Sequence, residues 1–367
     1  MKACFSVTND VVTDQRVIKI VRSLKKIGIE STILGRIHKK SIDIPESFND
    51  LNIIRFKTIF KKGPLFYAEF NIRIVIFLLR NKFNILVAND LDTLLANYLI
   101  SKLKKSILIY DSHELFTEVP ELTNRKLVKF IWLLIEKSIL PKIKYAYTVS
   151  SAIAKYYNFK YGIKMLVIRN IPPSNNKRIE KVLKKNIILY QGSINKGRGL
   201  EYMIEAMQYI ENFELHIIGD GDIIDNLKKL TIDKNLNNRV IFIDRMPFDK
   251  LINYTQQAWL GISVEEKIGY NYYFALPNKL FNYIQARVPI MVSDFPEMSK
   301  IVKKYNIGIT INSHEPQKIA ETIKYIYENK DLYNTWMKNL DAAAHELCWE
   351  NEEKILLTFF SLIIEKL

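Results

Sequence analysis

The stretch that decides the fold is "LYQGSINKGRGLEYMIEA", residues 189–206. An apolar run leads into a glycine-rich turn that begins at Gly192, and the apolar stripe of a helix follows. Glycine lets a backbone approach a ligand, and a helix N-terminus offers free N–H groups and positive potential. Lys196 and Arg198 on this turn suit a diphosphate, although an ordinary basic turn looks the same and the GxxxxGK[ST] sequence of a P-loop is absent. The stretch predicts a strand, a turn and a helix of a parallel α/β domain.

The same alternation of apolar runs and amphipathic segments extends along the whole chain. We expect strands near residues 2–7, 30–34, 52–56, 85–88, 106–111, 145–149, 165–168, 186–190, 213–218, 240–243, 259–263, 289–293 and 308–311. Apolar strands separated by helices indicate parallel sheets covered on both faces. Two such series predict an α/β protein with two doubly wound, Rossmann-like domains. Their boundary is expected at "NIPPSNNKR" (170–178), where Pro and Asn cluster without periodicity.

Length and composition agree with this organisation. A chain of 367 residues with 48% hydrophobic and 25% charged residues is typical of a globular protein with two domains. Cys4 and Cys348 lie far apart and have no metal-binding spacing, which favours a reduced, cytoplasmic protein. The N-terminus lacks the apolar stretch of a signal peptide, and the longest apolar runs are too short to cross a bilayer.

The positive charge of the chain is concentrated in its first half. Residues 1–180 hold 31 Lys and Arg against 15 Asp and Glu, whereas residues 181–367 hold 23 against 24. An AT-rich coding sequence would raise the lysine content of both halves equally, so it does not explain this difference. We therefore expect the first half to bind an anionic partner, which could be a membrane surface, a nucleic acid or a phosphorylated substrate. No RRM, KH or helix-turn-helix pattern supports a nucleic acid.

Two segments of the first half mix basic, aromatic and aliphatic residues, at 60–83 and 125–144. Such segments suit an anionic membrane surface. A buried helix with a solvated basic face would give the same pattern. Together with the excess of positive charge, they lead us to predict an anionic membrane surface as a partner.

A second turn-to-helix junction also suits an anion. In "ALPNKLFNY" (275–283), Pro277 pre-sets the first helical turn, and Asn278 and Lys279 lie where an anion would meet the open N–H groups. The alternative is a solvent-facing lysine on a capped helix. Two anion-suited helix starts at strand carboxyl ends of one domain, where doubly wound folds bind ligands, favour a functional role.

His113 follows an apolar strand in "YDSHELF" (110–116) and could contact a substrate, although a structural histidine is the alternative. No HExxH pattern or neighbouring His or Cys accompanies it, so we predict no metal site. Asp90-Leu91-Asp92 and Asp220-Gly221-Asp222 resemble a short DxD metal motif, but nothing else in the sequence supports one.

In their order and spacing, several stretches resemble the GT-B glycosyltransferases, in particular the retaining family 4 enzymes of bacterial surface-polysaccharide type. They are "TNDVVTDQRVIKIVRSLKKIGIESTILGR", "YDSHELF", "AYTVSSAIAKYY", "VIRNIPP", "YQGSINKGRGLEYMIEAM", "ELHIIGDGD", "RVIFIDRMP" and "PNKLFNYIQARVPIMVSDFPE". The resemblance implies two facing Rossmann-like domains with a cleft between them. Residues 1–172 would bind the acceptor, residues 173–349 would bind a nucleotide-sugar, and a last helix over 350–367 would pack back on the first domain.

The resemblance also assigns roles to single residues. Arg198 with Lys196, and Lys279 with Asn278, would bind the diphosphate, so that no metal or other cofactor would be needed. His113 would approach the donor sugar. The base-binding loop would fall at three further residues, which are Arg245, Met246 and Pro247.

This chain departs from the family at its paired carboxylates. The family's E-x7-E pattern ends on a glutamate that holds the ribose, and that position is Asn282 here; the first glutamate is replaced by Phe274. Asn282 can still hydrogen-bond ribose hydroxyls as donor and acceptor. Glu265 or Glu266, on the same loop, could compensate for the missing carboxylate.

We therefore predict a metal-independent, retaining glycosyltransferase. It would move a sugar from a nucleotide-sugar to a lipid-linked or polysaccharide-precursor acceptor. We expect it in the bacterial cytoplasm, peripheral on the inner face of the cell membrane. Arg198 and Lys279 would assist departure of the leaving group, and His113 would position the sugar. A nucleotide-sugar epimerase and a non-catalytic GT-B subunit remain as alternatives.

Overall fold

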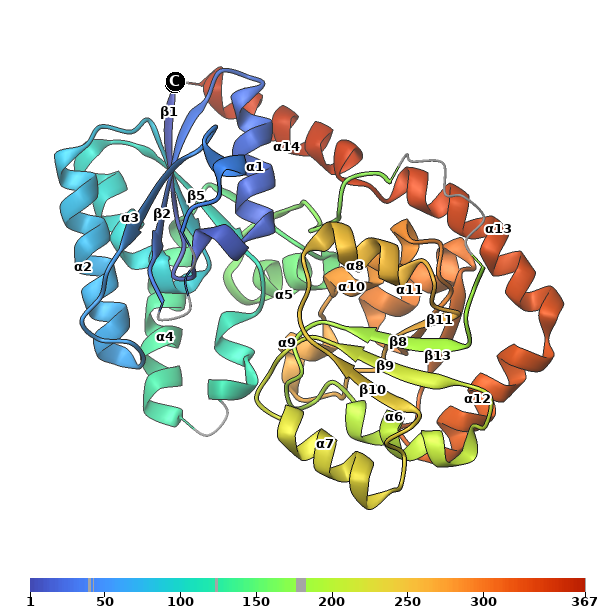
Figure 1. The fold of residues 1–367 in the computed structure, drawn as a ribbon. Helices are drawn as coiled ribbons and strands as arrows, with labels where there is room; N and C mark the ends of the chain where they lie inside the picture. Colours follow the sequence, from blue (N-terminus) through green and yellow to red (C-terminus); the bar gives the residue numbers. More distant parts are fainter. Residues whose placement is uncertain (39–40, 42, 123–124, 176–182, 367) are drawn as a thin grey trace. The chain divides into compact units, whose positions relative to one another are not determined.

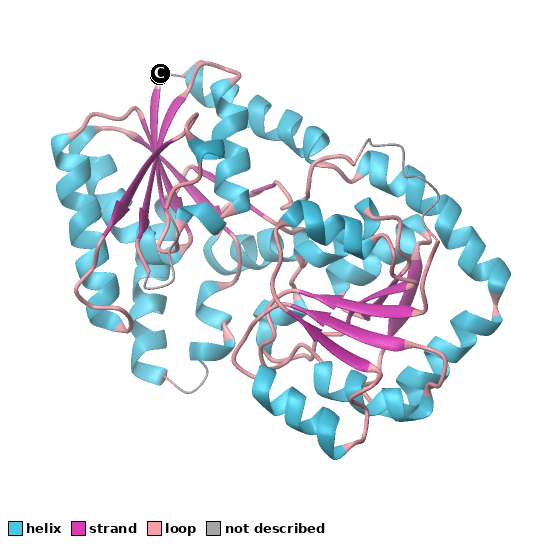
Figure 2. Ribbon diagram, viewed as in Figure 1, coloured by secondary structure: helices cyan, strands magenta, loops and turns pink. Residues whose placement is uncertain are grey.

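The computed structural model describes residues 1–367 except 39–40, 42, 123–124, 176–182 and 367. Its contacts divide the chain into two compact units (Figures 1 and 2). Unit 1 comprises Met1–Asn170 and Glu352–Leu367, and unit 2 comprises Ile171–Asn351. Residues 176–178 of the expected boundary segment and the last residue of the expected C-terminal helix lie outside the described residues.

Unit 1 is built on a sheet of seven parallel strands in the order β3-β2-β1-β4-β5-β6-β7. The strands are Lys2–Ser6 (β1), Glu30–Arg36 (β2), Asn52–Phe56 (β3), Ile85–Asn89 (β4), Ile107–Ser112 (β5), Tyr145–Thr148 (β6) and Leu166–Val167 (β7). The helices are Gln15–Lys25 (α1), Pro64–Arg80 (α2), Leu91–Lys104 (α3), Lys126–Ile139 (α4), Ser151–Tyr161 (α5) and the C-terminal Trp349–Ile364 (α14). One core cluster joins the inner stripe of α2 and α3 to strands β1, β2 and β4.

Unit 2 is built on six parallel strands in the order β10-β9-β8-β11-β12-β13. The strands are Ile187–Gln191 (β8), Glu214–Ile218 (β9), Val240–Ile243 (β10), Leu260–Ser263 (β11), Ile290–Ser293 (β12) and Gly308–Ile311 (β13). The helices are Leu200–Ala206 (α6), Ile224–Asp233 (α7), Phe248–Thr255 (α8), Gly269–Tyr273 (α9), Asn278–Gln285 (α10), Pro296–Tyr305 (α11), Pro316–Glu328 (α12) and Lys330–Glu346 (α13). Two core clusters, one on each face of this sheet, hold most of its apolar side chains.

Each predicted strand segment overlaps an observed strand, and the strand pairs are parallel. The prediction of an α/β protein with two doubly wound, Rossmann-like domains is therefore confirmed. The central strands, such as β1, β4, β8, β11 and β12, are buried along most of their length, so their sequences are apolar without alternation. No helix among the described residues is long and apolar enough to cross a membrane.

The strand order reverses once in each unit, and these two points position the sites described below. In unit 1 the chain leaves β1 toward β2, while β4 lies on the other side of β1. In unit 2 it leaves β8 toward β9, while β11 lies on the other side of β8. The turns that follow the two central strands therefore diverge at the carboxyl edge, which is where doubly wound sheets bind ligands.

Glycine is required where the turns of unit 2 pack against each other. A Cβ on Gly199, whose φ is +71°, would lie 2.1 Å from the carbonyl oxygen of Val264. A Cβ on Gly219 would lie 1.9 Å from the carbonyl oxygen of Gly192. The turn after β8 is thus held backbone to backbone by the turns after β11 and β9, so its side chains start from fixed positions.

The C-terminal helix α14 is tied to unit 1 by a buried glutamate. The carboxylate of Glu352 accepts hydrogen bonds from the backbone N–H of Arg169, at 2.8 Å, and from its guanidinium, whose Nε also lies at 2.8 Å. Further along the helix, Phe360 is buried and makes an edge contact with the Tyr147 ring. Glu353, the next residue, pairs with the exposed Lys26, which directly follows α1.

We predict that Glu352→Ala destabilises the protein far more than Glu353→Ala. The first change leaves the Arg169 guanidinium and a backbone N–H without their acceptor, at a cost of about 3 kcal/mol. The second removes the pair with the exposed Lys26 and the 2.6 Å hydrogen bond that Glu353 accepts from Oγ of Ser23, together worth about 1 kcal/mol. Denaturant unfolding curves of the two variants measure the difference. Equal losses of stability would contradict the anchoring role of Glu352.

Candidate functional site

Two cations meet at the point in unit 2 where the strand order reverses. Arg198 comes from the turn after β8, and Lys279 comes from the first turn of α10. The guanidinium of Arg198 lies 4.6 Å from the centre of the Tyr272 ring, and the ammonium of Lys279 lies 3.9 Å from the centre of the Tyr190 ring. Both aromatic faces stabilise positive charge, so the two side chains are held in place before any ligand arrives.

A buried carboxylate lies between these cations. Glu265, on the turn after β11, is 1% exposed. Its Oε1 lies 2.9 Å from Nζ of Lys279 and 3.7 Å from Nη1 of Arg198, and its Oε2 accepts a 2.8 Å hydrogen bond from Oγ of Ser263. Burial alone would raise the pKa of Glu265, but Lys279 and Arg198 hold that pKa below its ordinary value. The trio therefore carries one net positive charge.

Two donors at the same edge have no hydrogen-bond partner among the described residues. They are Nε of Arg198 and Nε2 of Gln191, the last residue of β8, and both atoms are buried. The other amide atom of Gln191 accepts a 3.1 Å hydrogen bond from Oγ1 of Thr255, which fixes the amide's orientation. Buried donors normally have acceptors, so these two groups suit the oxygens of an anionic or polyhydroxylated ligand.

The structure brings together only some of the residues expected at this site. A Cβ on Gly192 would lie 3.7 Å from Cε of Lys279, so the glycine-rich turn and α10 are in contact. Lys196 and Asn278 are exposed, and among the described residues their side chains make no hydrogen bond or ion pair with the trio. The backbone carbonyl of Lys196 accepts a 3.3 Å hydrogen bond from the hydroxyl of Tyr272, while its side chain is exposed.

The residues expected to bind the base and the ribose follow β10 or lie on α10, and no hydrogen bond or ion pair joins them to the trio within the described residues. Arg245 and Pro247 are exposed between β10 and α8, while Met246 packs against a core cluster. Asn282 is half-buried on α10, one turn beyond Asn278, and its amide has no hydrogen-bond partner within the described residues. The Asn282 amide is therefore available to a ligand.

An aromatic contact replaces the first carboxylate of the family pattern. The ring of Phe274 stacks on that of Tyr270, with centres 5.6 Å apart and an angle of 15° between the planes. Of the two glutamates that could compensate, Glu265 occupies the cation site, whereas Glu266 accepts a 3.2 Å hydrogen bond from the hydroxyl of Tyr202. The only carboxylate that the structure brings to the two cations of this site is thus that of Glu265, within the described residues.

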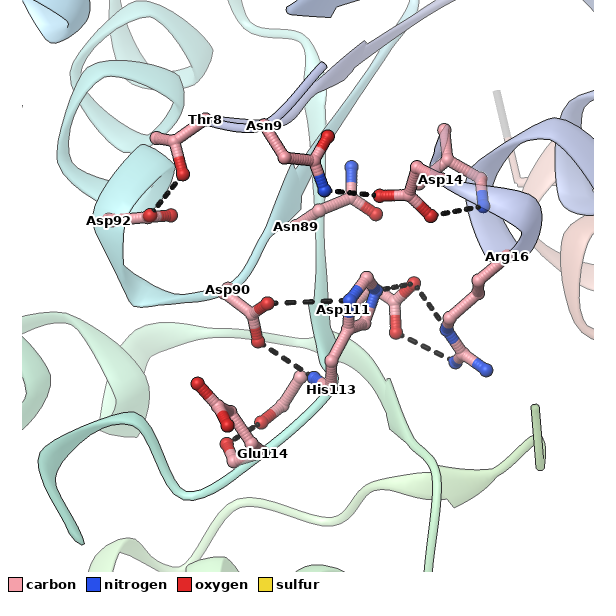
Figure 3. A network of polar contacts seen from close by, with 12 residues as sticks. Thr8, Asn9, Asp14, Arg16, Asn89, Asp90, Asp92, Asp111, His113 and Glu114 are labelled. Atoms are coloured by element: carbon pink, nitrogen blue, oxygen red, sulfur yellow. Dashed lines mark hydrogen bonds and ion pairs between the residues drawn. The ribbon is translucent and has the colours of Figure 1, made fainter. Parts of the chain in front are cut away.

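The corresponding edge of unit 1 holds His113 between two carboxylates (Figure 3). Nε2 of its ring lies 3.0 Å from Asp111, and Nδ1 lies 3.3 Å from Asp90. The backbone N–H of His113 also donates a 2.8 Å hydrogen bond to Asp90. Burial alone would lower the pKa of His113, but the two carboxylates raise it to about 9. His113 is therefore a cation at neutral pH, with both ring N–H groups donating.

Buried and strained groups support this histidine. Asp111 is fully buried and accepts two hydrogen bonds from the guanidinium of Arg16, at 3.1 and 2.8 Å. Burial alone would raise the pKa of Asp111, but Arg16 and His113 hold it at about 2. Asp90 has a φ of +61°, which is a strained conformation for a residue with a side chain. Such strain persists only where surrounding contacts fix it, here the bonds to His113.

A third carboxylate of unit 1, that of Asp92, bridges the point where the strand order reverses. Oδ2 of Asp92, on α3, accepts a 2.5 Å hydrogen bond from Oγ1 of Thr8, on the turn after β1 (Figure 3). Burial and the charge of Asp90 raise the pKa of Asp92 to about 7. The sequence predicted a functional role for His113 but did not predict that Asp90 and Asp111 contact its ring. The turns "TNDVVTDQR" and "NDLDT" were available as signals because both follow strands that should lie side by side.

No three His, Cys, Asp or Glu side chains within the described ranges form a group that could hold a metal ion. The expectation that the protein needs no metal and no other cofactor remains a prediction, since it concerns the reaction and not the side-chain groups alone.

We predict that His113 titrates with a midpoint of about 9, and that Asp90→Asn lowers this midpoint. Because the folded protein binds this proton more tightly than the unfolded chain, whose value is 6.5, the resulting stability is fully present below pH 6.5. It is lost as the pH rises through about 9. NMR titration of the imidazole protons checks this, and a midpoint at 6.5 or lower would refute the charged state.

A known protein family matches part of this sequence, and several solved structures have a similar fold. The family described as "Glycosyl transferases group 1" matches residues 173–342, which lie within unit 2. No curated protein matches the sequence. Sucrose-phosphate synthase from Thermosynechococcus elongatus has a similar structure, with a TM-score of 0.84, 15% identity and complete coverage of both chains.

Two further solved structures are similar. The Anabaena protein HepE in complex with UDP and glucose gives a TM-score of 0.75 at 13% identity, with all of both chains covered. WaaG, a glycosyltransferase involved in lipopolysaccharide biosynthesis, gives 0.70 at 14% identity, covering 96% of this chain and 98% of that one. The predicted GT-B fold is thus confirmed, and the prediction of a glycosyltransferase agrees with the match of residues 173–342 to the family described as glycosyl transferases group 1.

Proposed function

We propose that this protein transfers a sugar from a nucleotide-sugar, whose diphosphate binds Arg198 and Lys279 in unit 2. The observation that carries the proposal is the cation pair held by buried Glu265 where the strand order reverses, within the domain that matches a glycosyltransferase family. The complexes of the Anabaena protein with UDP and with UDP-glucose support a nucleotide-sugar as donor.

The chemistry requires stabilisation of the leaving diphosphate. As the glycosidic bond to the donor breaks, negative charge develops on the phosphate oxygens. Arg198, with its unpartnered Nε, and Lys279 present fixed donors and one net positive charge to those oxygens. We propose that this arrangement makes a metal ion unnecessary. We also propose that the anomeric configuration is retained, which means that the acceptor attacks from the same face that the leaving group leaves. This part of the proposal rests on the resemblance to family 4.

For the acceptor we propose a lipid-linked glycan or a polysaccharide precursor, met at the cytoplasmic face of a bacterial membrane. The excess of basic residues in the first half of the chain supports an anionic surface as partner. WaaG, a neighbour in structure, acts in lipopolysaccharide biosynthesis. His113 remains the proposed residue for positioning the sugar, and its positive charge suits a hydroxyl or anionic group.

The function is tested by incubation with a panel of nucleotide-sugars, with and without membrane extract. Free nucleotide together with a modified acceptor supports transfer. An isomerised sugar without acceptor would instead identify an epimerase, and binding without turnover would identify a non-catalytic subunit.

We predict that Arg198→Ala weakens nucleoside-diphosphate binding by roughly 1.5–3 kcal/mol, the value of a charge-assisted hydrogen bond. Lys279→Met should weaken binding and also destabilise the fold, because it leaves the buried Glu265 with only a distant cation. The double variant Lys279→Met, Glu265→Gln should regain stability but not affinity. Calorimetry and unfolding curves separate the two effects. Unchanged affinity in all three variants would show that the diphosphate does not bind at this site.

We predict that Asn282→Ala weakens nucleotide binding by about one net hydrogen bond, roughly 0.5–1.5 kcal/mol, because the free amide reaches the ribose. Asn282→Glu should be tolerated, since it restores the residue of the resembling family, and Asn282→Leu should be worse than Ala because it adds bulk without a partner. Titrations of the preferred nucleoside diphosphate measure the series. Binding like the parent in all three variants would show that Asn282 does not touch the ribose.

A further inference from the structure

A cavity of about 560 Å³ opens at the amino edge of the unit 1 sheet, where β1, β2 and β3 begin. Its lining comes from unit 1 alone, and includes the first residues of these strands and residues at the ends of α1 and α2. The volume lies within the range of small-molecule sites, about 300–1,000 Å³. His113 lies at the opposite edge of the same sheet, so the cavity is separate from the His113 site. We call it the amino-edge cavity.

Part of the wall of the amino-edge cavity is apolar. The rings of Phe77 and Phe83 lie with their centres 6.1 Å apart, and Ile54 of β3 lines the cavity beside them. All three side chains pack against the core cluster of α2 and α3 on one side, yet they are only half-buried. Covering this remaining apolar surface would be favourable, so the wall suits the apolar part of a ligand.

The amino-edge cavity passes around the edge of the sheet. Ser31 and Thr32 of β2 both line it, and successive side chains of a strand point to opposite faces. This passage is open because β3 begins only at Asn52, opposite Thr32, so that no described strand lies beside Glu30 and Ser31 on that side. A cavity that extends over both faces of a sheet edge favours an extended, flexible ligand.

A buried hydroxyl in the lining has no hydrogen-bond partner among the described residues. It is Oγ of Ser31. The neighbouring hydroxyl differs, because Oγ1 of Thr32 accepts a 2.9 Å hydrogen bond from Nδ2 of Asn52. Buried polar side chains normally have partners, so the Ser31 hydroxyl is suited to donate to an oxygen of a ligand.

The lining also carries a positive charge. Three exposed lysines line the cavity and form no ion pair within the described residues: Lys2, Lys25 and Lys82. Of the two carboxylates in the lining, that of Asp50 accepts two 3.0 Å hydrogen bonds from the guanidinium of Arg22, which leaves Glu30 against the lysines. Lys25 also offsets the negative end of α1, in whose last turn it lies. Lys2 belongs to β1, so no helix explains it. The excess of cations favours an anionic ligand.

We propose that the amino-edge cavity binds an acyl carboxylate, a small molecule with one apolar chain and one negative charge. Its chain lies against Phe77, Phe83 and Ile54. Its carboxylate accepts hydrogen bonds from Ser31 and from the lysines. The inference goes beyond the proposed function, because it assigns a second ligand site that contains no residue proposed to act in sugar transfer.

Other ligands match only part of the lining. Inorganic phosphate would contact the lysines but leave the apolar wall uncovered. A neutral chain would cover that wall but leave the lysines and the Ser31 hydroxyl without an anion. A ligand with both parts is therefore the best match, and the test below compares the three classes.

The test is calorimetric titration of the full chain with decanoate, decanol and inorganic phosphate. We expect decanoate to bind and decanol to bind at least about tenfold more weakly, because it lacks the charge-assisted hydrogen bonds. Octanoate should bind about fifteenfold more weakly than decanoate, since each CH₂ removed from an apolar contact costs about fourfold in affinity. Absence of decanoate binding, or equal binding of decanol or phosphate, would overturn the proposal.

Two sets of variants locate the bound decanoate. Ser31→Ala should lower its affinity about threefold to tenfold and leave the unfolding curve unchanged, because the hydroxyl has no partner in the described part of the protein. Lys2→Gln with Lys82→Gln should lower the affinity about fivefold.

The matched control for charge is Lys229→Gln with Lys250→Gln, on exposed lysines of unit 2, which should bind decanoate like the parent. Equal losses in this control and in the cavity variants, or no loss in the cavity variants, would show that decanoate binds elsewhere and overturn the proposal.

A nucleoside diphosphate separates this site from the proposed donor site. Saturating decanoate should leave nucleoside-diphosphate affinity unchanged, because no residue of the amino-edge cavity belongs to the cation site of unit 2. Displacement of decanoate by the nucleotide would place both ligands in one site and overturn the proposal. If decanoate binds as expected and no nucleotide binds, the proposed function fails while the amino-edge cavity stands.

Discussion

Parallel strands deliver every strand-to-helix turn of a sheet to one edge, and both candidate sites of this protein depend on that constraint. In unit 1 it brings Thr8 and Asp92, 84 residues apart, to within 2.5 Å of each other. In unit 2 it brings the turn after β8 to α10, with Arg198 and Lys279 on either side of Glu265. The glycines of the unit 2 turns matter because backbone contacts, and not side-chain contacts, set the spacing there.

The buried charges are balanced in the site of unit 1 but not in the site of unit 2. In unit 2 one carboxylate, Glu265, offsets two cations, so a positive charge is left for an anionic ligand. In unit 1 Arg16 and His113 are matched by Asp111 and Asp90, so the network is neutral as a whole. This difference explains why a diphosphate is assigned to unit 2, although the excess of basic residues in the sequence lies in the first half of the chain. That excess is found on exposed helix surfaces instead, as at Arg80 and Lys126.

The sequence predicted the strands well because the central strands are buried along most of their length and leave apolar runs. It also predicted Arg198 and Lys279 as two anion-suited side chains at strand ends. It named Glu265 or Glu266 as a carboxylate of the same loop, but not that Glu265 pairs with the two cations, because the neighbours look equivalent in sequence and only burial distinguishes them. In unit 1 the partners of His113 were missed, since a lone histidine gives no indication of which carboxylates lie across the sheet edge.

A co-crystal structure with a nucleoside diphosphate tests the central claim most directly, which is that the cations around Glu265 bind the diphosphate of the donor. The account predicts phosphate oxygens within hydrogen-bond distance of Arg198 and Lys279, at the edge of unit 2 where the strand order reverses. Among the contacts of the nucleoside, the account predicts the Asn282 amide on the ribose. A diphosphate bound elsewhere, with Glu265 still the sole partner of Lys279, would contradict it.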